Sequence, residues 1–342
     1  MSSLVIGGAG FIGANVCDDL LKRGEEVYLL DNFSRYGTLI NLRWLEETHK
    51  GIKVVPADIR VDRDILRSMV EKVDAVYHLA AQVAVTTSVT DPRLDFEINA
   101  LGTFNVLEAL RTSDRKPLLI FASTNKVYGE MTDLEVVERD GRYEYYDLSF
   151  GVSEERALDF HSPYGCSKGA ADQYVIDYGR IYNLRTVSLR QSCIYGVHQF
   201  GVEDQGWVAH FTISAIYGRP ITIYGDGKQV RDVLYIEDMI KLYNLVREKI
   251  AVASGKAYNI GGGPDNRMSL LELVDFLEKF VGNKVNLKYS DWRPGDQKVF
   301  VSDIRCAASE LGWKPRIGVR EGVSALAKWV EENRDIFRNL YT

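Results

Sequence analysis

The feature that most constrains the fold is a glycine-rich turn between a short apolar run and an amphipathic stretch at the start of the chain. Residues 3–6 have the pattern of a buried strand, and residues 15–23 that of a helix. Gly7, Gly10 and Gly13 lie between them at every third position. Small residues let the backbone approach a pyrophosphate, and a helix N-terminus offers free N–H groups. The turn therefore predicts a dinucleotide site, with a purely structural turn as the alternative.

Strand and helix patterns alternate through the first half of the chain, which predicts a doubly wound, parallel (Rossmann-type) α/β sheet. The expected further strands are residues 26–30, 52–55, 75–79, 117–122 and 185–190. Long helices are expected over residues 95–111 and from Ser162-Pro163 onward, where Pro occupies the first helical turn. Periodicity fails over residues 130–160, so a long loop is expected there, at the mouth of the site.

Shorter elements follow residue 190, which predicts a smaller, mixed α/β C-terminal lobe for the substrate. The expected helices are 205–217, 237–249 and 270–280, and the expected strands are 221–224 and 230–234. We therefore divide the chain into residues 1–190, the cofactor domain, and 191–342, mainly the substrate lobe. The boundary is approximate, and the chain is free to cross between the two.

An acidic residue, Asp31, ends the second expected strand about twenty positions after the glycines. A carboxylate there suits a ribose 2′-hydroxyl and repels a 2′-phosphate, which favours NAD over NADP. Arg35 complicates this prediction, because a nearby basic residue can serve NADP. Asp31 occupies the strand end itself, so NAD is the cofactor that we expect. The alternative is that Asp31 is a turn or helix cap.

Tyr164 and Lys168 are four residues apart, so they share one face of a helix. A nearby ammonium favours the ionised form of a phenol, whose ordinary pKa is about 10. Lys168 alone is too weak for this task, and an oxidised nicotinamide ring would add a second positive charge. Such a tyrosine accepts a proton from a sugar hydroxyl while hydride leaves the same carbon. An ordinary amphipathic helix is the simpler explanation of a lone Tyr/Lys pair.

Composition excludes several other classes of protein. The formal net charge of −6 argues against a nucleic-acid-binding surface. No apolar run has the length of a membrane span, and the N-terminus lacks the basic region of a signal peptide. The four cysteines show neither metal-site spacing nor a disulfide framework. We therefore expect a cytoplasmic protein without a metal.

Taken together, these motifs resemble the extended short-chain dehydrogenase/reductase family, and within it the nucleoside-diphosphate-sugar epimerases and dehydratases. The resemblance runs from Leu4 to about Trp329 and depends on the order and spacing of its motifs. They are Gly7/Gly10/Gly13, Asp31, Asp58-Ile59, Leu79-Ala80-Ala81, Asn99 with Gly102-Thr103, Ser123-Thr124, Tyr164/Lys168 and Arg231-Asp232.

The resemblance implies an isomerase with tightly bound NAD, a nucleotide-sugar substrate and a homodimer or homotetramer formed through helices 95–111 and 164–182. It implies Tyr164, Lys168 and Thr124 as the catalytic residues. The cofactor contacts are expected at Gly7, Gly10, Phe11, Ile12, Gly13, Asp31, Asn32, Ser34, Arg35, Asp58, Ile59, Leu79, Ala80, Ala81, Gln82, Asn99, Ser123, Tyr164, Lys168, Gln191 and Ser192. The substrate contacts are expected at Thr124, Asn125, His161, Gln205, Val208, Tyr224, Arg231 and Arg293.

Several segments resemble the C2 epimerases of CDP-linked dideoxyhexoses within this family. They are residues 123–129, 158–174, 204–208 and 227–234. Family dehydratases carry an acidic pair where this chain has Asn125 and Lys126, and Cys193 stands where most members have Asn. A C2 epimerase acting through a transient 2-keto sugar is therefore favoured, with CDP-hexose as the expected substrate. A 4-epimerase is the main alternative, followed by a 4,6-dehydratase and a non-catalytic NAD sensor.

Overall fold

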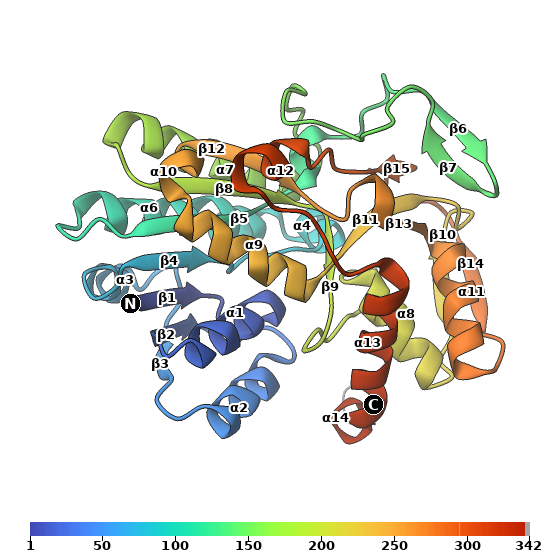
Figure 1. Ribbon diagram of the computed structural model, residues 1–342, viewed down its shortest axis with the longest axis horizontal. Helices are drawn as coiled ribbons and strands as arrows, with labels where there is room; N and C mark the ends of the chain where they lie inside the picture. Colours follow the sequence, from blue (N-terminus) through green and yellow to red (C-terminus); the bar gives the residue numbers. More distant parts are fainter. Residues whose placement is uncertain (294, 339–342) are drawn as a thin grey trace.

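A computed structural model describes residues 1–293 and 295–338 (Figure 1). Its largest element is a seven-stranded sheet in the order β12-β8-β5-β4-β1-β2-β3, and every strand pair in it is parallel. The strands are β1 (Ser2–Ile6), β2 (Glu26–Asp31), β3 (Lys53–Pro56), β4 (Ala75–His78), β5 (Leu118–Thr124), β8 (Thr186–Gln191) and β12 (Lys256–Ile260). The predicted doubly wound parallel sheet is confirmed.

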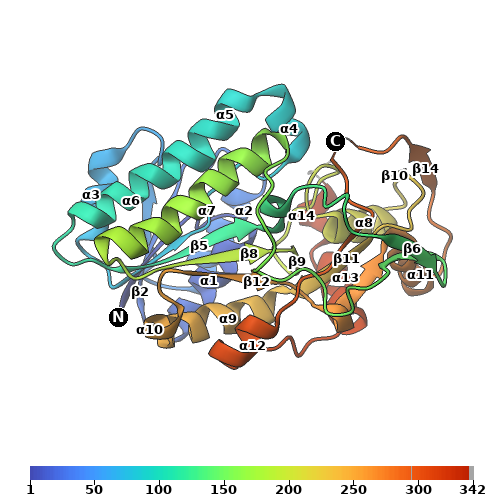
Figure 2. The same cartoon turned by 90° about the horizontal axis from the view of Figure 1, so that it is seen from above.

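Helices cover both faces of this sheet, as the continuous apolar strands require. Leu4 and Ile6 of β1 point into one core cluster and Val5 into the other. The cluster with Leu4 and Ile6 includes residues of α3 (Arg63–Val70), α6 (Gly102–Thr112) and α7 (Ser162–Tyr182). The cluster with Val5 includes residues of α1 (Phe11–Lys22), α2 (Thr38–Thr48) and α9 (Ile236–Glu248). Figure 2 shows α6 and α7 side by side on the first face.

The smaller lobe lies to the right in Figure 1 and is built on two short sheets. In one, β10 (Ile221–Tyr224) pairs with β14 (Leu287–Ser290). In the other, β11 (Val230–Tyr235) pairs with β9 (Cys193–Tyr195), β13 (Arg267–Ser269) and β15 (Val299–Phe300). Its main helices are α8 (Trp207–Ile216), α11 (Leu270–Val281) and α13 (Val319–Glu332). Both α9 and β12 follow residue 191 yet pack in or against the large sheet, so the chain crosses between the two parts.

Three local expectations were wrong. The first helix begins at Phe11 rather than at residue 15, so its N-terminus lies directly at the glycine turn. The single helix expected over 95–111 is instead α5 (Pro92–Phe96), a π-helical turn (Glu97–Leu101) and α6. The stretch 130–160 contains an antiparallel hairpin, β6 (Val136–Arg139) and β7 (Arg142–Tyr145). Asp140 and Gly141 join its strands with positive φ, the geometry of a two-residue hairpin turn.

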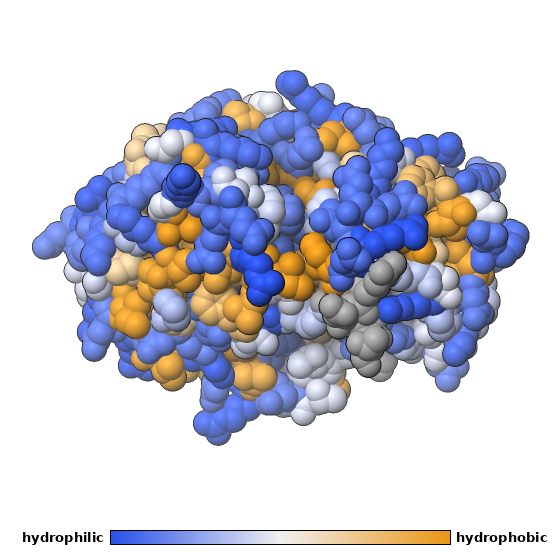
Figure 3. Space-filling view, turned by 90° about the horizontal axis from the view of Figure 1, so that it is seen from below, coloured by the Kyte–Doolittle hydropathy of each residue, from blue (hydrophilic) through white to orange (hydrophobic). Residues whose placement is uncertain are grey.

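The remaining short helices connect these elements. They are α4 (Val85–Thr90), α10 (Ile250–Ala253), α12 (Arg305–Leu311) and α14 (Arg334–Arg338), with 3-10 turns at Asn125–Tyr128 and Pro264–Asn266. Within the described ranges, no helix combines the length and the apolar character needed to cross a membrane. The face drawn in Figure 3 carries a band of apolar side chains among hydrophilic ones.

Candidate active site

A cavity of about 490 Å³ lies at the carboxyl ends of β1, β2 and β4, where the strand order reverses. Ligands of open parallel sheets bind at this switch point, in pockets of roughly 300–1,000 Å³. Fifteen of the residues expected to contact the cofactor line it: Gly7, Gly10, Phe11, Ile12, Gly13, Asp31, Asn32, Ser34, Arg35, Asp58, Ile59, Leu79, Ala80, Ala81 and Gln82. The structure therefore gathers most of the expected cofactor contacts around one cavity.

The glycine turn is too tight for side chains at two positions. Gly7 has a φ of +79°, and a Cβ on it would lie 2.6 Å from the backbone nitrogen of Ala80. A Cβ on Gly13 would lie 2.1 Å from the carbonyl oxygen of Gly7. The turn thus keeps the start of α1 close to the ends of β1 and β4, so that backbone N–H groups line a narrow anion site. These residues fit a dinucleotide.

Asp31 is buried at the end of β2, and both of its carboxylate oxygens accept hydrogen bonds from backbone N–H groups. One accepts a hydrogen bond from the N–H of Ala9 at 3.1 Å, and the other accepts one from the N–H of Phe33 at 2.8 Å. Burial raises the pKa of the carboxyl group above its ordinary value, while these two N–H donors oppose the shift. The carboxylate therefore shapes the glycine turn and keeps lone pairs free for ribose hydroxyls.

Arg35 reaches across the cavity. Its guanidinium donates to the carbonyl of Ala81 at 3.5 Å and to the side chain of Gln205, which also lines the cavity. Arg35 is thus held by hydrogen bonds to Ala81 and Gln205, while the oxygens of Asp31 hold Ala9 and Phe33, which agrees with NAD. Gln205, expected at the substrate, lies on the cofactor side in this structure.

Asn99 belongs to a buried hydrogen-bond network next to the cavity, which the sequence did not predict. Its side chain accepts from the N–H of Gln82 at 2.9 Å and donates to the carbonyl of Gln82 at 3.0 Å. It also donates to Asp95 and to Ser167 of α7, both at 3.1 Å. The π-helical turn that carries Asn99 therefore ties the cofactor loop to the catalytic helix. Such turns are frequent at functional sites.

Thr124, Tyr164 and Lys168 meet at the end of β5. Tyr164 and Lys168 are both buried, on the first turns of α7. The Thr124 hydroxyl is hydrogen-bonded to the Tyr164 phenol, and it accepts from the backbone N–H of Lys126 at 3.2 Å. The Lys168 ammonium donates to the carbonyl of Ala122 at 2.6 Å and lies over the ring of Phe121. The predicted trio thus lies together in one buried cluster.

The electrostatics of this cluster differ from the expectation. Burial raises the pKa of Tyr164 to about 12, and the hydrogen bond with Thr124 only partly opposes it. Burial also lowers the pKa of Lys168 to about 7, because its ammonium has lost most of its hydration. Lys168 is not among the charges that lower the pKa of Tyr164, since the carbonyl of Ala122 holds it. Without further positive charge, Tyr164 remains a phenol at neutral pH.

The cationic residues expected at the substrate meet carboxylates from distant segments. Arg231 on β11 pairs with Asp296 at 2.6 Å. Arg293 pairs with Asp204 at 3.0 Å and stacks on the ring of Tyr224, 3.9 Å from its centroid. Arg231 lies near Lys126 of the catalytic turn, and Arg293 lies on the ring of Tyr224. Arginines and an aromatic ring suit phosphates and a base.

Other expected contacts have different partners. Asn125 is buried beside Thr124, and Ser123 is buried at the same strand end. His161 pairs with Asp159 at 3.0 Å and with Glu130 at 3.5 Å, and it does not cap α7. Three further side chains point elsewhere: Gln191 to Tyr243, Ser192 to Asp232 and Val208 into the core.

Lys126 and Cys193 also belong to this region, although sequence reasoning assigned neither. The side chain of Lys126 lies near Arg231, Asp296, Cys193 and Glu130, and burial lowers its pKa to about 8. The Cys193 sulfur lies 3.4 Å from the indole nitrogen of Trp207. Both residues depart from the family pattern, and this departure is the feature of the sequence that could have identified them.

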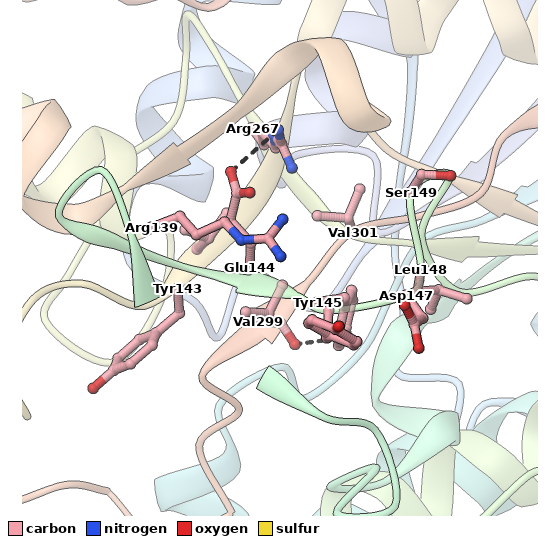
Figure 4. A pocket seen from close by; sticks show the side chains of 12 residues that line it. Arg139, Tyr143, Glu144, Tyr145, Asp147, Leu148, Ser149, Arg267, Val299 and Val301 are labelled. Atoms are coloured by element: carbon pink, nitrogen blue, oxygen red, sulfur yellow. Dashed lines mark hydrogen bonds and ion pairs between the residues drawn. The ribbon is translucent and has the colours of Figure 1, made fainter. Parts of the chain in front are cut away.

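The β6–β7 hairpin does not line the cofactor cavity. With the segment that follows it and β11, β13 and β15, it encloses a separate cavity of about 280 Å³ (Figure 4). Arg267 pairs there with Glu144 at 3.2 Å, and Tyr145 donates to the carbonyl of Val299 at 2.8 Å. The described residues contain no cluster of three or more metal-ligating side chains suited to an ion.

Comparison with known proteins agrees with this geometry. Residues 4–326 match the family model described as GDP-mannose 4,6 dehydratase. The chain is 43% identical to CDP-paratose 2-epimerase of Salmonella typhi, over 96% of this chain and 99% of that protein. The crystal structure of UDP-glucuronic acid 4-epimerase from Bacillus cereus with UDP-glucuronic acid and NAD is 29% identical, with a TM-score of 0.84 over 97% and 100% of the two chains. DesIV, the dTDP-glucose 4,6-dehydratase of Streptomyces venezuelae with NAD bound, is 27% identical, with a TM-score of 0.85 over 99% and 100%.

The chain therefore belongs to the GDP-mannose 4,6-dehydratase family, among the extended short-chain dehydrogenases/reductases. It is an enzyme of the epimerase (isomerase) type, and its cofactor is NAD.

Proposed function

We propose that this protein is a nucleotide-sugar 2-epimerase that interconverts CDP-paratose and CDP-tyvelose. The observation that carries the proposal is the 43% identity to CDP-paratose 2-epimerase over nearly the whole of both chains. The site supports it, because Asn125, Lys126 and Cys193 depart from the common family pattern, Asn125 lies beside Thr124, and Lys126 lies near Cys193.

The C2 hydrogen of a sugar is not acidic, so inversion by direct proton removal is excluded. When bound, NAD supplies the oxidant that takes and returns the C2 hydride, and a positive charge near Tyr164. The Tyr164 phenolate accepts the proton of the C2 hydroxyl, and Thr124 donates a hydrogen bond to the reacting oxygen. After the 2-keto sugar has rotated so that its opposite face receives the hydride, Tyr164 returns the proton to the C2 oxygen.

Rotation of the ketone requires weak contacts to the sugar and firm contacts to the diphosphate. Arg231 and Arg293 are the proposed diphosphate contacts, and Tyr224 lies against Arg293 at the nucleoside end. Lys168 holds the cofactor ribose: its ammonium has three N–H donors, and the carbonyl of Ala122 takes one of them. The cofactor contacts proposed from the sequence complete the site.

A 4-epimerase is the second candidate, because UDP-glucuronic acid 4-epimerase shares the fold over nearly the whole chain. The same Tyr, Lys and NAD serve C2 and C4, so the catalytic trio does not discriminate. The chain has no carboxylate at positions 125 and 126, which disfavours a dehydratase.

We also propose that two copies associate through α6 and α7. Figure 2 shows the two helices side by side, and exposed apolar side chains occur on and near them. They are Phe96, Phe104, Tyr174, Ile181 and Tyr182. Light scattering of the purified protein should give a dimer or tetramer, and a monomer would contradict this arrangement.

Incubation of the NAD-loaded enzyme with CDP-paratose tests the function. NMR of the product should show inversion at C2 only, with no conversion of UDP-glucose to its C4 epimer. Conversion of UDP-glucose, with CDP-paratose unchanged, would replace this proposal with the 4-epimerase.

A further inference from the structure

Lys126 stands between the catalytic turn and the arginines of the smaller lobe. Its backbone N–H donates to the Thr124 hydroxyl at 3.2 Å, and its carbonyl packs against Gly165, the residue after Tyr164. A Cβ on Gly165 would lie 3.4 Å from that carbonyl oxygen. The backbone of Lys126 is therefore fixed against the catalytic residues.

The side chain of Lys126 lies beside Arg231 of β11 and the segment around Gly295. Its ammonium lies 3.4 Å from the carbonyl of Gly295, and the charge of Arg231 acts on it more strongly than any other. Two cations lie together here, and Asp296 and Glu130 are the nearby carboxylates. A half-buried pair of like charges is unfavourable unless an anion lies between them.

The covalent structure of the substrate places its anion close to the reacting carbon in one reaction only. In a nucleotide sugar the phosphate is attached through oxygen to C1. C2 is bonded to C1, whereas C4 lies on the far side of the ring. When C2 faces Tyr164, the sugar-proximal phosphate must therefore lie near the catalytic turn; when C4 faces Tyr164, the whole ring separates them.

We propose that Lys126 binds the sugar-proximal phosphate of the nucleotide sugar and thereby presents C2, rather than C4, to Tyr164. The inference rests on the proposed function and adds a residue that determines which carbon reacts. Arg231 shares the same anion from β11, and Arg293 lies nearer the nucleoside with Tyr224. The substrate phosphate then takes the place of Asp296 as the counter-ion of this pair.

The lowered pKa of Lys126 makes this role dependent on pH. Burial lowers its pKa to about 8, so part of its charge is lost as the pH rises through that value. The charged or titratable groups that face it are Arg231, Asp296, Cys193 and Glu130. Of these, only the Cys193 thiol can also change charge in the alkaline range, and burial raises its pKa. Phosphate affinity should therefore fall with rising pH above about 8.

Calorimetric titration of the NAD-loaded enzyme with CDP, CMP and cytidine tests the proposal, because only CDP carries the sugar-proximal phosphate. Lys126→Met should weaken CDP binding about tenfold or more, the scale of a charge-assisted hydrogen bond, and leave CMP and cytidine unchanged. Lys126→Arg should retain most of the CDP affinity. The matched control is Lys228→Met, which removes a partly exposed lysine paired with Glu138.

The pH series separates binding from a structural role. Between pH 7.5 and 9.5 the wild-type affinity for CDP should fall, whereas the Lys126→Arg enzyme should show a flat profile. An unchanged CDP affinity in Lys126→Met, or an equal loss for CDP and CMP, overturns the assignment of Lys126. If the wild-type enzyme binds no CDP at all, the proposed function falls instead.

Discussion

The two sides of the cleft recognise their ligands by different means. The cofactor side uses backbone geometry and strand ends: Gly7 and Gly13 lie in the turn and helix that follow β1, and Asp31 ends the neighbouring strand β2. The substrate side uses long charged side chains, and Arg231 and Arg293 are each paired with a carboxylate. The first side is therefore preformed, whereas binding on the second requires an exchange of counter-ions.

The largest expected effect comes from removing the group that lies between the two sides. Tyr164→Phe deletes the proton acceptor, so kcat should fall about 10²-fold or more, with NAD content and CDP affinity retained. Tyr178→Phe is the matched control, because it removes a hydroxyl from the same helix that is bonded to Glu108. Near-normal turnover by Tyr164→Phe would mean that another residue is the base.

A smaller effect is expected on the cofactor side alone. Asp31→Ser removes the carboxylate that accepts from Ala9 and Phe33, so NAD affinity should fall about tenfold and discrimination against NADP should weaken. CDP affinity should not change. Mass spectrometry of the cofactor released from denatured wild-type protein should give NAD, and release of NADP would refute the role of Asp31. Asp265→Ser, at an exposed turn of the smaller lobe, is the control.

The smallest effect concerns salt. Raising NaCl from about 50 to 500 mM should weaken CDP binding roughly three- to tenfold, because screening acts on the half-exposed arginine and lysine charges. The NAD content of the same samples should stay constant, since the cofactor is held mainly by buried backbone groups. Equal sensitivity of both ligands would remove the proposed contrast between the two sides.

This contrast also explains what the sequence could predict. The doubly wound parallel sheet followed from the alternation of strand and helix patterns. The cofactor cavity followed from Gly7 to Gly13, Asp31 and the small residues after β4, because each motif is short and its function depends on local backbone geometry. Helical spacing placed Tyr164 and Lys168 on one face of a helix, and the family resemblance implied their catalytic role.

Pairs of side chains that are far apart in the chain could not be predicted from the sequence in the same way. Nothing local links Arg231 to Asp296, Arg293 to Asp204 or Lys168 to the carbonyl of Ala122. The π-helical turn at Asn99 was missed because its side-chain partners, Gln82 and Ser167, lie on other elements. The β6–β7 hairpin was missed although Asp140-Gly141 is a strong turn signal, since the charged strands around it lack a clear alternation.

The most direct test of the central claim is an isotope measurement on the carbon that reacts. CDP-paratose carrying deuterium at C2 should be epimerised more slowly than the unlabelled substrate, and the product should keep its deuterium at C2 because the cofactor remains bound. Deuterium at C4 should leave the rate unchanged. A rate that falls only with the C4 label, or a product inverted at C4, would contradict the account and identify the enzyme as a 4-epimerase.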